Sequence, residues 1–150
     1  MSDAATVALP VRHAGFIRLS GLAGIVGGIL LIVVAVIAWF AVSSQLRAEN
    51  IVIPDDAIAC QGKVGDGPID AFIQANIINT HALEATDGQT YAELDQDDPA
   101  RAIVMNASFL RTSLFTSVVS FGVALLAAGV GVLMVLFGLS LRWLVPKPVR

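Results

Sequence analysis

The sequence is poor in the residues that most often carry chemistry. It contains one cysteine, Cys60, and two histidines, His13 and His81. A single cysteine excludes an internal disulfide, so Cys60 is either buried and inert or free to form an intermolecular bridge. Neither histidine has a cysteine nearby or a second histidine four residues on, whereas a metal site needs three or four converging ligands. We therefore expect no metal and no cofactor.

Charge is also missing, from two long stretches. Arg18 and Arg47 are separated by 28 uncharged residues, and Arg111 and Arg142 by 30. A helix rises ~1.5 Å per residue and needs roughly 20 apolar residues to cross ~30 Å of hydrocarbon. The two stretches therefore predict two membrane spans. The first is too long for the apolar core of a cleaved signal peptide, which favours a retained anchor.

The charges that remain are distributed unevenly. Residues 43–113 hold eleven acids and four bases, a net charge of -7, whereas residues 1–18 carry +1 and residues 142–150 carry +3. Lys and Arg near the ends of spans favour the cytoplasmic side. We therefore expect a membrane protein with both termini in the cytoplasm. The predicted segments are a cytoplasmic tail (1–18), a span (19–42), an extracytoplasmic acidic helical cap (43–113), a second span (114–141) and a cytoplasmic tail (142–150).

Helix-start signals predict an all-α fold with two helices after the first span. Pro68 favours the first position of a helix over 69–86, and Asp98-Pro99 favours the start of a helix over 99–142. This second helix is about 65 Å long at ~1.5 Å per residue, so its first turns should project from the membrane. We expect the 69–86 helix and an extended segment at 51–53 to pack against them.

Small residues recur every four positions in both spans, at Ser20, Gly24 and Gly28 and at Ser120, Ala124 and Ala128. Small residues allow helix backbones to approach closely in lipid, where no hydrophobic effect drives helices together. The two faces could pack against each other within one chain. They could also meet a second copy or another membrane protein.

Four acidic residues, Glu93, Asp95, Asp97 and Asp98, form one cluster that could hold a cation. The cluster lacks the glycine and the terminal glutamate of an EF-hand loop. Asp98 also has a structural use as a helix cap, and acids near a helix N-terminus stabilise the helix dipole. Helix capping and a weak Ca²⁺ site are the two interpretations.

No catalytic signature is present: the sequence has neither a Gly-x-Ser-x-Gly motif nor a P-loop. The spans contain no ionisable residue, which argues against a transporter or proton pump. The acidic middle region would repel the phosphates of a nucleic acid. The favoured function is a non-enzymatic accessory or scaffolding subunit that contacts the lipid bilayer and a membrane or envelope protein, or itself. The alternative is an extracytoplasmic sensor of a small ligand or cation.

Several segments resemble one family, including Ser43–Ile51, Asp66-Gly67-Pro68, His81–Ala85, Thr90–Leu94, Asp98–Arg101 and Asn106–Arg111. The chain is similar over nearly its whole length to small two-span membrane proteins of actinobacteria, some of which carry the name of an aromatic ring-opening dioxygenase. The resemblance implies a bacterial plasma membrane. It implies no dioxygenase site here, because a non-haem iron centre needs a triad of histidines and a carboxylate.

Overall fold

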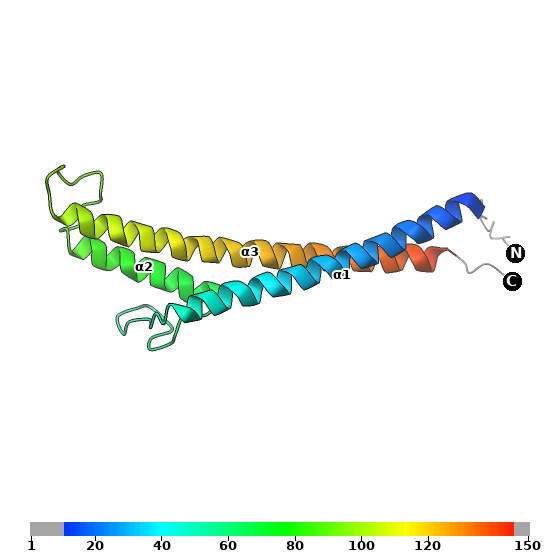
Figure 1. The fold of residues 1–150 in the computed structure, drawn as a ribbon, viewed down its shortest axis with the longest axis horizontal. Helices are drawn as coiled ribbons and strands as arrows, with labels where there is room; N and C mark the ends of the chain where they lie inside the picture. The colour runs from blue at the N-terminus through cyan, green and yellow to red at the C-terminus, as the bar shows by residue number, and fades with distance from the viewer. Residues whose placement is uncertain (1–10, 146–150) are drawn as a thin grey trace, which may run out of the picture. The chain divides into compact units, whose positions relative to one another are not determined.

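The computed structural model describes residues 11–145 and contains three α-helices over that range (Figure 1). They are α1 (Val11–Ala48), α2 (Pro68–Glu84) and α3 (Ala100–Leu144). The all-α prediction is confirmed, and α2 and α3 begin within one residue of the predicted starts. Residues 1–10 of the predicted N-terminal tail (1–18) and residues 146–150 of the predicted C-terminal tail (142–150) lie outside the described residues.

Local signals explain where the helices begin and end. Pro68 occupies the first turn of α2, where its missing N–H costs nothing. At the start of α3, the Asp98 carboxylate accepts a hydrogen bond of 2.8 Å from the Ala100 amide. α1 ends before Asn50, which adopts a left-handed φ of 50° that asparagine tolerates better than most residues.

Both long helices are apolar and long enough to cross a membrane. Only 11% of the most apolar window of α1 and 17% of that of α3 are buried. The core helix of a soluble protein would be mostly buried. Five hydroxyl groups in α3 donate to the carbonyl four residues earlier, which satisfies them within the helix. The donors are Thr112, Thr116, Ser117, Ser120 and Ser140.

The chain forms two compact units. The two-helix unit consists, within the described residues, of 11–36 and 125–145 and pairs α1 with α3 in antiparallel orientation. A methyl group on Gly28 would lie 2.5 Å from the carbonyl oxygen of Gly131, and one on Gly138 would lie 2.5 Å from that of Gly21. The backbones can approach this closely only because these positions lack a side chain.

The three-helix unit consists of residues 37–124 and contains all of α2. Its main core joins Leu46 of α1, Ala71 and Ala75 of α2, and Leu114 and Phe121 of α3. The Trp39 and Phe121 rings meet edge to face with centroids 4.7 Å apart. α2 therefore packs against both long helices.

The segment between α1 and α2 forms a small hairpin-like loop. Val52 and Val64 form an isolated antiparallel bridge, and Ile53 exchanges backbone hydrogen bonds with Gly62 and Lys63. Gly62 has a φ of +69°, which glycine adopts without strain. The extended segment at 51–53 is confirmed. It packs through Ile53 against Ile73 of α2, not against α3 as expected.

Candidate functional site

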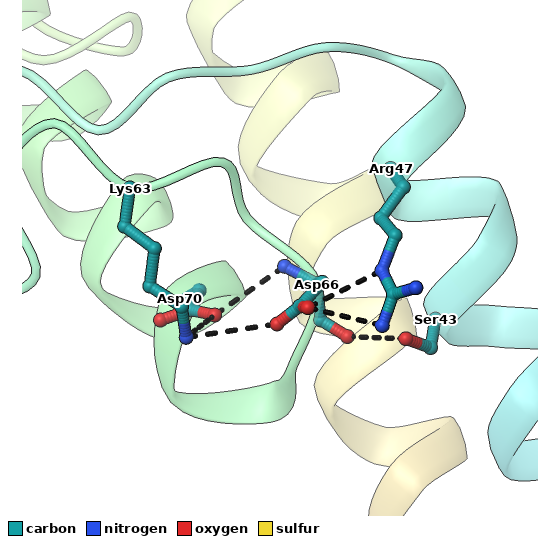
Figure 2. A network of polar contacts seen from close by, with 5 residues as sticks. All are labelled: Ser43, Arg47, Lys63, Asp66 and Asp70. Atoms are coloured by element: carbon teal, nitrogen blue, oxygen red, sulfur yellow. Dashed lines mark hydrogen bonds and ion pairs between the residues drawn. The ribbon is translucent and has the colours of Figure 1, made fainter.

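A network of charged groups ties the end of α1 to the loop before α2 (Figure 2). Asp66 is its centre. The Arg47 guanidinium donates to Asp66 Oδ2 through Nε at 3.2 Å and lies 3.1 Å away through Nη2. The Ser43 hydroxyl donates to the Asp66 carbonyl oxygen at 2.7 Å. Two side chains one turn apart on α1 therefore hold this loop in place.

The first turn of α2 supplies the buried member of the network, Asp70, which is only 3% exposed. Lys63 Nζ lies 2.9 Å from Asp70 Oδ2, and the Asp66 amide donates to the same oxygen at 3.3 Å. Lys63 also lies 3.6 Å from Asp66 Oδ1. A carboxylate in the first turn of a helix also stabilises the helix dipole. The network thus fixes both the loop and the start of α2.

The pKa shifts of this network favour the charged forms of its groups. Burial alone would raise the pKa of Asp70, but Lys63, the Asp66 amide and the Cys60 thiol together hold that pKa below its usual value. The hydrogen bond and the charge of Asp70 raise the pKa of Lys63. A general acid needs a raised carboxyl pKa and a basic lysine needs a lowered one. Both groups instead stay charged and paired at neutral pH, so the arrangement holds structure together.

A second ion pair joins the hairpin-like loop between Val52 and Val64 to the last turn of α2. His81 Nε2 on α2 lies 2.6 Å from Asp56 Oδ2. The hydrogen bond from His81 lowers the pKa of Asp56, and the same bond raises the pKa of His81. His81 is on an exposed face of α2, and the sequence did not predict its partner 25 residues earlier.

A pocket of about 300 Å³ lies between α2, the 85–99 loop and α3. Its lining combines apolar groups of Leu83, Val104 and Ala107 with the polar side chains of Tyr91 and Arg111. The lining includes no acidic side chain.

Tyr91, which forms part of the pocket wall, is held in place by Arg101. The Arg101 guanidinium lies 4.1 Å from the centre of the Tyr91 ring and donates to the Leu94 carbonyl at 2.6 Å. Such a cation over an aromatic face stabilises the ring position. The loop therefore presents Tyr91 in a fixed orientation.

Two of the four acidic residues proposed as a cation cluster, Glu93 and Asp98, have separate structural partners. The Glu93 carboxylate accepts from the Thr90 amide and hydroxyl, each at 2.7 Å, and these bonds lower the pKa of Glu93. Asp98 caps α3. Asp95 and Asp97 are exposed. Within residues 11–145, no three His, Cys, Asp or Glu side chains come together in an arrangement that could hold a metal ion.

Of the small residues proposed for helix packing, Gly24 and Gly28 face α3. Gly28 meets Gly131 and Val135, and Gly24 meets Met134 and Gly138. Ala124 is buried, whereas Ser20, Ser120 and Ala128 are half-buried. The glycines that meet α1 are therefore Gly131 and Gly138, which the four-residue pattern did not include. Their spacing of seven matches Gly21 and Gly28, and a seven-residue repeat is typical of helices that pack along a coiled-coil seam.

Sequence reasoning did not identify the charged network or the Arg111 pocket. The network had a local signal, because Lys63, Asp66 and Asp70 follow one another at spacings of three and four around Pro68. No local signal indicated the contribution of Arg47, because Arg47 belongs to a helix that is distant in sequence.

No family model, no curated protein and no solved structure matches the chain. The resemblance to two-span actinobacterial proteins therefore stays a prediction, and the function has to be inferred from the fold and the site themselves.

Proposed function

We propose that the chain is a non-enzymatic, two-pass protein of the plasma membrane that acts as an accessory or scaffolding subunit. Residues 19–42 and 114–141 cross the bilayer, both termini face the cytoplasm, and residues 43–113 form an extracytoplasmic cap. The partner is a membrane or envelope protein, or a second copy of the chain.

Membrane insertion is supported by the surface of the long helices. Large apolar side chains are exposed around α1 and α3, and water would leave them unfavourably solvated. Lipid is the solvent that fits such a surface. Representative members are Leu30, Val34, Ile37, Leu126, Leu133 and Phe137.

The scaffolding role rests chiefly on Ile58. This side chain is 87% exposed at the tip of a loop that is pinned by the His81–Asp56 pair and the Val52–Val64 bridge. Single exposed apolar side chains are common on protein surfaces, so Ile58 supports the role through its place on an ordered loop, which holds it available for a partner. Beside it, Asp56 pairs with His81, and the hydrogen bond between them lowers the pKa of Asp56 and raises the pKa of His81.

Labelling of single cysteines tests the topology. In a Cys60→Ser background, a cysteine replacing Ile58 should react with a membrane-impermeant maleimide in intact cells. A cysteine replacing the exposed His13 should react only after the membrane is opened. The reverse pattern, or equal labelling of both sites in intact cells, would contradict the proposed orientation.

Site-specific photo-crosslinking tests the role. A photoreactive amino acid at Ile58 should give a discrete protein adduct in native membranes, whereas the same group at the exposed polar Gln96 should not. Co-expression of two tagged copies distinguishes self-association from a different partner. If gentle extraction after crosslinking at Ile58 yields only the monomer, the scaffolding role is wrong.

The alternative role as an extracytoplasmic sensor is favoured by the pocket at Arg111 and Tyr91. Its cation version predicts that millimolar Ca²⁺ raises the thermal unfolding midpoint, because a ligand that binds only the folded state stabilises it. An unchanged midpoint would exclude this version.

A further inference from the structure

Arg111 is in an unusual environment for an arginine. Its Nε is shielded from solvent and has no hydrogen-bond partner. The guanidinium lies 5.9 Å from the centre of the Phe115 ring, and no carboxylate of the described residues pairs with it. A buried donor without an acceptor costs about 1–3 kcal/mol. The site is therefore suited to an anion from outside the chain.

The pocket beside Arg111 supplies the rest of a ligand site. Leu83, Val104 and Ala107 form apolar walls, and Asn79 and Ser108 add polar groups. Small-molecule sites typically combine apolar walls with a few placed polar groups.

We propose that this pocket binds an amphipathic organic anion, with a carboxylate or phosphate head on Arg111 and a short apolar tail along Leu83, Val104 and Ala107. A guanidinium binds such oxyanions through paired N–H donors. The absence of acidic side chains from the lining matters because residues 43–113 are otherwise acidic. This ligand site goes beyond the proposed scaffolding role, and an experiment can disprove either one without disproving the other.

The dimensions restrict the ligand. A cavity of about 300 Å³ is at the small end of ligand pockets. At ~30 Å³ per water-sized group it holds roughly ten non-hydrogen atoms. A head with a tail of about six carbons fits this volume. The same chemistry is found in a free amphiphile and in the head and upper chain of an anionic lipid, and Arg111 precedes the predicted span 114–141 by three residues.

Tyr91 is a convenient reporter because it lines the pocket and is the single tyrosine of the chain. Protein labelled with 3-fluorotyrosine therefore gives one ¹⁹F resonance. In non-ionic micelles at constant ionic strength, hexanoate and hexyl phosphate should shift this resonance saturably. Hexanol and inorganic phosphate, which each lack one half of the ligand, should require at least tenfold higher concentrations.

Three variants assign the effect to the site. Arg111→Gln should weaken hexanoate binding at least tenfold, whereas Arg142→Gln, a matched change at the far end of α3, should leave it unchanged. Ala107→Leu keeps the cation and fills the pocket, so it should also abolish binding. Circular dichroism of each variant without ligand verifies that it folds. Because Ala107→Leu adds apolar volume and removes no charge, it keeps the test valid if Arg111→Gln does not fold.

Two lipid compositions distinguish the sources. If an anionic lipid occupies the pocket, nanodiscs with one-third phosphatidylglycerol should shift the Tyr91 resonance relative to pure phosphatidylcholine, in wild type but not in Arg111→Gln. If the ligand is a free amphiphile, the two discs should agree and hexanoate should shift both. The proposal is wrong if no shift in either experiment depends on Arg111, or if hexanol binds as well as hexanoate.

Discussion

The two units contain segments of the same two long helices but use residues of different size between them. In the two-helix unit, the buried positions include the glycines at 21, 28, 131 and 138, where the backbones of α1 and α3 approach each other. In the three-helix unit, Leu114 and Phe121 occupy the core, and α2 enters it through Ala71 and Ala75. Residue size at buried positions therefore decides whether α3 pairs closely with α1 or shares its contacts with α2.

The two units are also stabilised by different kinds of interaction. In the proposed bilayer, lipid would provide no hydrophobic drive for helix association, so the two-helix unit would depend on close packing. The three-helix unit adds aromatic contacts and ion pairs, including the Asp66–Asp70 network and the His81–Asp56 pair. We expect the first unit to be sensitive to added volume and the second to be sensitive to lost charge.

Adding one methyl group to the two-helix unit should give the largest effect. In Gly131→Ala the new Cβ would lie 2.7 Å from the Gly28 carbonyl oxygen and 2.8 Å from Ile32 Cγ1. Overpacking of this kind costs about 1–3 kcal/mol. Steric trapping with biotinylated cysteines at His13 and Trp143 would measure the loss of helix pairing.

The matched control is Gly129→Ala on the same helix. No heavy atom lies within 4 Å of the Cβ built there. Since alanine favours a helix by up to about 1 kcal/mol over glycine, this variant should be neutral or more stable. Equal losses for both alanines would mean that the glycine contact does not hold the helices together.

Removing charge from the three-helix unit should give the next effect. Asp70→Asn weakens the pairing of a buried carboxylate with Lys63, and a hydrogen bond to a charged group contributes about 1.5–3 kcal/mol. Because Lys63 is half exposed, we expect about 1–2 kcal/mol. Hydrogen exchange at the Asp66 amide, which donates to Asp70, should accelerate about fivefold to thirtyfold, since about 1.4 kcal/mol is a factor of ten.

The exposed Asp55 provides the control, and Asp55→Asn should leave this amide unchanged. Acidity gives a second check. The folded-state pKa of Asp70 is lowered, so its stabilisation is present above the ordinary value of 3.8 and is lost as the pH falls through the folded value. The difference between wild type and Asp70→Asn should therefore vanish in acid. If it persists there, the carboxylate charge is not what stabilises the loop.

The comparison also shows what sequence patterns can predict. Pro68 and Asp98 act within their own turn, so their helix starts were predicted to within one residue. The length and apolarity of α1 and α3 are likewise local properties. The contacts of Arg47 with Asp66 and of Gly28 with Gly131 depend on the register between segments that are distant in sequence. Residue spacing within one helix indicates which face of that helix can pack, but it does not identify the residue of the other helix that will contact this face.

The smallest expected effect is at the exposed His81–Asp56 pair, where pH acts as the probe. The folded-state pKa of His81 is raised by the hydrogen bond to Asp56, so its stabilisation is complete below 6.5 and is lost as the pH rises through the raised value. The pKa of Asp56 is lowered by the same bond, so its stabilisation is complete above 3.8 and is lost as the pH falls through the lowered value. His81→Gln should therefore lower the thermal midpoint most between pH 3.8 and 6.5.

A double-mutant cycle separates this pair from other effects of pH. Asp56→Asn should lower the midpoint over the same pH range, and the double variant should lose little more than either single variant, because the two side chains stabilise the fold only through each other. His13→Gln, a change at an exposed histidine outside the three-helix unit, should have no effect. Additive losses, or a loss that persists in alkali, would mean that the loop carrying Ile58 is held by the Val52–Val64 bridge alone.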